Sequence, residues 1–105
     1  MDGQKYISAF SLKAGTRLAG VSPVICVALV VAWSVYSRHA APLVVTSVTD
    51  GSHMSGSLHH AGLAVDIRLP IYDTPRVVSE LKQSLGAEYD VVLELDHIHI
   101  EYDPP

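Results

Sequence analysis

The chain has 105 residues, of which 49% are hydrophobic and 17% charged. This is enough apolar material for one compact core and predicts a single domain over residues 1–105. The formal net charge of −4, with lysines and arginines scattered singly, argues against nucleic-acid binding, because no basic stripe is present to neutralise phosphates. The single cysteine, Cys26, excludes an intrachain disulfide, and its apolar neighbours predict a buried, inert thiol.

The first part of the chain is predicted to be helical. Residues 4–18 fit a short, weakly amphipathic helix without the pattern of a secretory signal. Residues 21–36 carry no formal charge, but a bilayer span needs roughly 20 apolar residues. Ser22 followed by Pro23 is typical of an N-cap and a first helical position. We therefore expect a helix over residues 23–38 that is apolar on every side and buried in the domain, with a membrane anchor as the alternative.

Short strands dominate the rest of the chain. The apolar and β-branched runs predict strands at 43–47, 64–68, 89–93 and 97–102. A helix is expected to open at Thr74-Pro75, with Thr74 as its cap, and to stop at Gly86. This order predicts an α+β fold, a small and mainly antiparallel sheet with N-terminal helices packed on one face.

A histidine and an aspartate flank a predicted turn. His59 ends the polar loop 49–58, Gly62 permits a sharp turn, and Asp66 lies on the strand that follows. The turn allows the imidazole and the carboxylate to converge, which supplies two of the three protein ligands that a catalytic zinc ion needs. The alternative is that these are polar loop and strand residues without a shared partner.

The third ligand is expected from the last strand. His97 and His99 are two residues apart and therefore share one face of that strand, while Ile98 and Ile100 face the core. Glu101 shares the face of the histidines. We expect its carboxylate to be a solvated surface group, with an orienting partner of a zinc ligand as the alternative.

The pattern resembles a known family. The motif runs Ser57-x-His59-x-x-Gly62-x-Ala64-x-Asp66 and is followed some thirty residues later by His97-x-His99. It resembles the LAS family of zinc peptidases, which includes D-Ala-D-Ala carboxypeptidases, L-Ala-D-Glu endolysins and the related zinc domain of hedgehog proteins. The resemblance covers about residues 44–102 and implies a fold like that of the hedgehog and D-Ala-D-Ala peptidase domains.

The resemblance also implies the metal and its ligands. It assigns Zn²⁺ to His59, Asp66 and His99, with His97 as the alternative third ligand. Glu94 matches the acid–base residue of the family, and Asp96 is the second choice for that role. In such a site His97, or His53 of the polar loop, can donate a hydrogen bond to the reaction's oxyanion.

The implied function is hydrolysis of bacterial peptidoglycan by a monomer that acts on stem peptides and has no membrane or nucleic-acid partner. The bond cleaved stays open between the carboxypeptidase and endopeptidase types. Leu63 stands where the family often has arginine, and the arginine that commonly follows the first strand is absent near Thr49. A non-catalytic zinc-binding module is therefore the alternative function.

Overall fold

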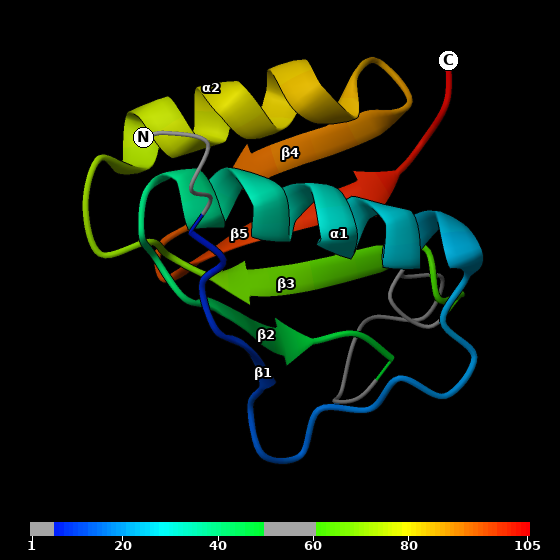
Figure 1. Ribbon diagram of the computed structural model, residues 1–105. Helices are drawn as coiled ribbons and strands as arrows, with labels where there is room; N and C mark the ends of the chain where they lie inside the picture. Colours follow the sequence, from blue (N-terminus) through cyan, green and yellow to red (C-terminus); the bar gives the residue numbers. More distant parts are fainter. Residues whose placement is uncertain (1–5, 50–60) are drawn as a thin grey trace.

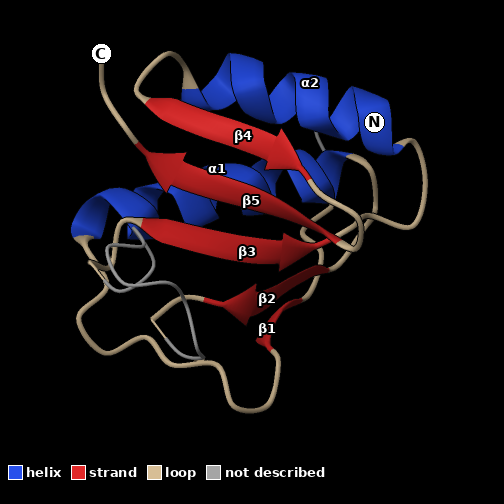
Figure 2. Cartoon of the chain, turned by 180° about the vertical axis from the view of Figure 1, so that it is seen from behind, coloured by secondary structure: helices blue, strands red, loops and turns tan. Residues whose placement is uncertain are grey.

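Five strands form one sheet, and both helices cover the same face of it (Figures 1 and 2). The computed structural model describes residues 6–49 and 61–105. The elements follow the order β1 (Phe10–Leu12), α1 (Pro23–Arg38), β2 (Leu43–Ser47), β3 (Ala64–Arg68), α2 (Thr74–Leu85), β4 (Tyr89–Leu93) and β5 (His97–Tyr102). The strand order in space is β1-β2-β3-β5-β4, and only the β1–β2 pair is parallel. The predicted α+β class and the mainly antiparallel sheet are confirmed.

The strands from β2 to β5 begin and end at the predicted residues. Their alternation explains the two faces of the sheet. Val65 and Ile67 of β3, with Ile98 and Ile100 of β5, are fully buried in the core beneath the helices. The residues between them point to the opposite face, which no helix of residues 6–49 and 61–105 covers (Figure 2). This helix-free side of the sheet is called the open face below.

Helix α1 begins as predicted, because the Ser22 hydroxyl accepts a hydrogen bond from the Val24 N–H at 3.4 Å and Pro23 follows the cap. In a fold of two layers, however, a helix buries only the side that faces the sheet. Val27 and Val30 are exposed on the other side, and so is Cys26. The expectations of a helix buried all round and of a buried thiol were wrong. No helix in the described part of the chain is long and apolar enough to cross a membrane.

The helix predicted over 4–18 is absent from its described part, residues 6–18. Strand β1 lies there instead and pairs in parallel with Leu43–Val45. The Phe10 ring packs against Trp33 of α1 at 5.3 Å between centroids. Pairing with β2 therefore outweighs a weak helical pattern, and the second helix of the layer, α2, comes from the middle of the chain.

Helix α2 buries Val77, Leu81 and Leu85 and ends before Gly86, whose φ is +81°. Its cap differs from the prediction by one residue, since Asp73 occupies the N-cap position with a φ of +58° and no side-chain capping bond. The helix packs next to β4 (Figure 1), on the same face of the sheet as α1.

Candidate metal centre

The open face brings together four of the predicted site residues. Asp66 of β3 lies directly opposite His99 of β5, and His97 lies two residues before His99 on the same face. Glu94 lies in the connection between β4 and β5, next to His97. His59 and His53, the other two predicted residues, lie outside the described residues.

Among the predicted ligands that the structure describes, Asp66 and His99 form the shortest contact. Oδ1 of Asp66 is 2.9 Å from Nδ1 of His99, and Oε1 of Glu101 is 2.8 Å from Nε2 of the same ring. The hydrogen bond with Asp66 and the further bond with Glu101 outweigh burial and raise the pKa of His99 to about 9. Glu101 is therefore an orienting partner of His99, and the expectation of a solvated surface carboxylate was wrong.

His97 lies between three carboxylates. Its Nε2 atom is 2.9 Å from Oε1 of Glu94 and 3.7 Å from Oδ1 of Asp66, while its Nδ1 atom is 2.7 Å from Oδ1 of Asp96. Burial alone would lower the pKa of His97, but the bond with Asp96 and the charges of Asp66 and Glu94 together raise it. A protonated His97 is a hydrogen-bond donor at both nitrogens.

The two candidate bases occupy opposite sides of the His97 ring. Glu94 contacts Nε2, the nitrogen that faces Asp66, whereas Asp96 contacts Nδ1 and its side chain is 86% exposed. The N–H of Glu94 donates to the carbonyl of His97 at 2.9 Å, so this tight connection brings the Glu94 carboxylate to the open face. Of the two, Glu94 is the one directed toward the centre of the site.

Two of the described residues, Asp66 and His99, lie at a spacing close to that of two zinc ligands. With bonds of about 2.0–2.1 Å, two ligand atoms of a tetrahedral zinc site lie about 3.3 Å apart. The 2.9 Å between Asp66 Oδ1 and His99 Nδ1 needs only a small side-chain rotation to reach that spacing. If His99 held a metal through Nδ1, its Nε2–H would donate to Glu101 at the observed 2.8 Å, and a ligating histidine usually has such an acceptor. The third expected ligand, His59, lies outside the described residues.

A second group of carboxylates lies on the same side of the sheet. Ligand atoms of Asp90, Glu101 and Asp103 all lie within 4.8 Å of one another. Because they are exposed or half-exposed and offer oxygen alone, they do not match zinc, whose ligands usually include nitrogen or sulfur. The group nevertheless makes this end of the open face strongly acidic.

Comparison of the chain with protein-family models, curated proteins and solved structures finds no match in any of the three.

One cation of the open face was missed by the sequence analysis. Arg68 lies directly opposite His97 and two residues after Asp66, so it shares their side of the sheet. Its side chain is exposed. The signal was the alternation of side chains along a strand. Arg68 follows Asp66 by two residues on β3, just as His99 follows His97 on β5, so each pair shares one face.

Proposed function

We propose that this protein is a zinc-dependent peptidase that hydrolyses peptide bonds of bacterial peptidoglycan. The observation that carries the proposal is the position of Asp66, whose Oδ1 atom lies 2.9 Å from His99 Nδ1 and 3.7 Å from His97 Nε2 on an open face. Its class of substrate comes from the motif that resembles the LAS peptidases. The hedgehog-like or peptidase-like form of the α+β fold is part of the same proposal.

Zinc would be held by His59, Asp66 and His99, and it would supply an acidified water and a polarised carbonyl. Glu94 is the proposed general base, which takes a proton from the water and returns it to the leaving amine. His97 is the proposed donor to the oxyanion, because its raised pKa favours the protonated ring. His97 stays the alternative third ligand, and in that case His53 would take over the donor's role.

Arg68 is the proposed contact for a substrate carboxylate. A guanidinium presents paired N–H donors that match a carboxylate, and Arg68 stands beside His97 on the open face. This cation compensates for the arginine that the motif lacks at Leu63. It favours the carboxypeptidase type, in which a terminal carboxylate lies next to the bond that is cleaved.

The second candidate is a non-catalytic zinc-binding module. It is favoured by the contact between Glu94 and His97, 2.9 Å long, because a base held by another side chain is less available to a water. The deciding experiment is digestion of purified peptidoglycan by the zinc-loaded protein, followed by mass analysis of the fragments. Release of stem-peptide fragments that Glu94→Gln does not release supports the enzyme. A fully loaded protein that releases none indicates the binding module.

A further inference from the structure

Strand β4 is the last strand at its side of the sheet, and its outer edge pairs with no other strand in the described residues. Two backbone hydrogen bonds fix which groups of β4 face β5. The Glu94 N–H donates to the His97 carbonyl, and the Asp103 N–H donates to the Glu88 carbonyl. In an antiparallel ladder the N–H and carbonyl groups of successive residues point alternately toward the partner strand and away from it. The N–H and carbonyl groups of Val91 and Leu93 therefore point outward, away from β5.

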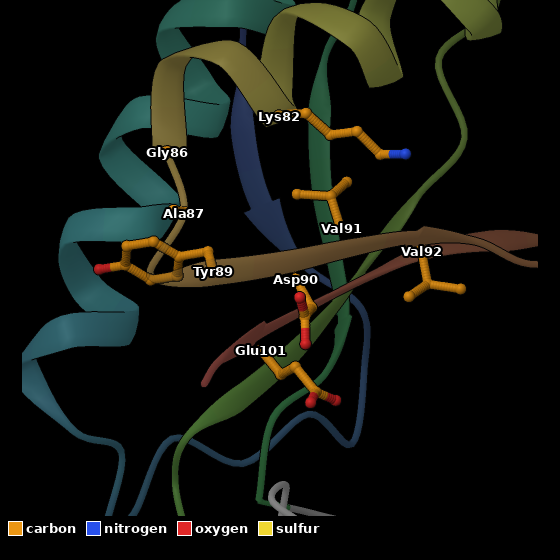
Figure 3. Close-up of a pocket in the computed structure, with 8 residues that line it drawn as sticks. All are labelled: Lys82, Gly86, Ala87, Tyr89, Asp90, Val91, Val92 and Glu101. Atoms are coloured by element: carbon orange, nitrogen blue, oxygen red, sulfur yellow. The ribbon is translucent and has the colours of Figure 1, made fainter. Parts of the chain in front are cut away.

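A groove of about 490 Å³ runs along this edge (Figure 3). The last turn of α2 and Gly86 form one wall, and residues of β4 form the other. Figure 3 shows Lys82 and Val91 on one side of the β4 ribbon and Asp90 with Glu101 on the opposite side. The groove thus extends around the edge of the sheet and reaches both of its faces.

The charges along the groove differ between the two sides. Lys82 is exposed on the side of the helices, while Asp90 and Glu101 lie opposite each other on the open face. Side chains of an added strand would also alternate between these two sides. An acidic residue directed toward Lys82 and a neighbouring basic residue directed toward Asp90 would match both.

We propose that the outer edge of β4 binds an extended peptide as a sixth strand, and that the peptide carries an acidic and a basic residue next to each other. Backbone hydrogen bonds to Val91 and Leu93 would supply affinity, and the flanking charges would supply selectivity, as in other cases of strand addition. This site goes beyond the proposed peptidase function, because none of its contacts needs the metal. The segment of the peptide that binds at the β4 edge is not cleaved at that edge.

A second copy of the chain is the other occupant that an open strand edge attracts. Antiparallel self-pairing that centres on Val91 sets Glu88 opposite Glu94 of the copy. Self-pairing centred on Val92 sets Asp90 opposite that same glutamate. Like charges directly opposite one another destabilise strand pairs, so the charges disfavour self-association and favour a peptide with both signs.

The test uses capped hexapeptides with glutamate and lysine at the central positions and valine or threonine around them. Binding is followed by amide chemical shifts and hydrogen exchange of the full-length protein. We expect the amides of Val91 and Leu93 to exchange quickly alone and to become protected with the peptide. N-methylation of the alternate amides that face β4 should lower affinity by roughly tenfold or more, and methylation of the other alternate set should have little effect.

Two protein variants test the contacts, and a third serves as a control. Lys82→Glu should weaken the glutamate–lysine peptide several-fold and strengthen a peptide with two central lysines, whereas Gln83→Glu, an exposed neighbour on α2, should change neither. Leu93→Pro removes an outward N–H without removing a bond to β5, and it should weaken the binding of all the peptides. A thermal melt of each variant checks that it is folded.

Three outcomes would overturn the proposal. One is equal binding by both N-methylated peptide series, which would show that the backbone edge is not used. Another is protection of Val91 and Leu93 that depends on protein concentration in the absence of peptide, which would assign the edge to a second copy. The third is the lack of any shift at β4 with millimolar peptide. None of these results bears on the zinc content or on peptidoglycan hydrolysis, so the peptidase proposal is tested separately.

Discussion

Asp66 and His99 face each other across the β3–β5 pair, and their side chains touch at 2.9 Å between Oδ1 and Nδ1. The contact is fixed by strand register rather than by a flexible loop. A slip by one residue would turn Asp66 into the core and Ile67 to the open face. The backbone of the sheet therefore holds two expected ligands in place before any metal arrives.

Removal of either residue should abolish stable zinc binding. We expect one zinc ion per chain in the wild type, and clearly less than one in Asp66→Ala, His99→Ala and His59→Ala after dialysis, as measured by metal analysis. His39→Ala is the control, because His39 pairs with Glu80 at 3.0 Å, away from these residues. Undiminished zinc in the Asp66 and His99 variants would disprove the site.

Glu94→Gln keeps the size of the side chain and removes its basicity. Since a general base contributes about 10²–10⁴-fold to the rate, kcat should fall by that factor while zinc stays bound. Asp96→Asn should have a much smaller effect, because Asp96 contacts the Nδ1 side of His97. Kinetics with a defined stem peptide, combined with metal analysis, would check both variants. The reverse ranking would transfer the role of base to Asp96.

The metal-free protein should lose stability as the pH rises toward 9. The folded pKa of His99 is about 9, above its ordinary value of 6.5. Protonated His99 therefore contributes stability that is fully present below pH 6.5 and is lost as the pH rises through about 9. At about 1.36 kcal/mol for each unit of pKa, the contribution is at most about 3 kcal/mol. Urea unfolding of the chelator-treated protein at several pH values should show this decline, and His99→Asn should flatten it.

Zinc uptake should release protons for the same reason. His99 must lose its proton to bind the metal, so about one proton per zinc should appear near pH 7, as measured by calorimetry in buffers of different ionisation enthalpy. Zinc uptake by the wild type without any proton release would show that His99 does not lose a proton to the metal.

Arg68→Ala should raise KM more than it lowers kcat if its guanidinium binds a terminal carboxylate. A loss of affinity of about tenfold is expected for a peptide with a free carboxylate, and little change for the same peptide with an amidated end. Arg76→Ala on α2 is the matched control, since Arg76 pairs with Glu80. Equal effects of Arg68→Ala on both peptides would remove this residue from the substrate site.

Tyr36→Phe should destabilise the fold. The Tyr36 hydroxyl donates to the carbonyl of Arg68 at 2.7 Å, and Tyr36 is fully buried. Its loss leaves the carbonyl of Arg68 without this donor. The free energy of unfolding should fall by about 1–3 kcal/mol, as measured by urea unfolding. Tyr72→Phe, at a 78% exposed position, should change the free energy of unfolding by less than about 0.5 kcal/mol. Comparable losses in both variants would contradict the role of this bond.

Strands β2 to β5 were predictable because local patterns and tertiary packing agree. The alternation of Ile98 and Ile100 with His97 and His99 gives both the strand and its two faces, and the β-branched residues add propensity. The end of α1 and the stop of α2 at Gly86 follow from equally local chemistry.

Apart from the cap of α2, the failures share one cause, which is that the deciding contact lies far away in the chain. Strand β1 exists because residues 10–12 pair with β2. The exposure of Cys26 depends on which side of α1 faces the sheet. The partnership of Glu101 with His99 required both side-chain directions to be known. A single segment of sequence carries none of this information.

Gly62 links the site to a distant part of the chain. Its φ is +74°, a side chain there would collide with the carbonyl of Gly20, and its own carbonyl accepts the Ser22 N–H at 2.9 Å. The glycine of the motif therefore serves as an anchor for the N-terminal segment as well as a turn. A shortened chain that starts at residue 23 would keep every expected ligand and still lose this anchor, so attempts to isolate a minimal folded fragment should retain residues 20–22.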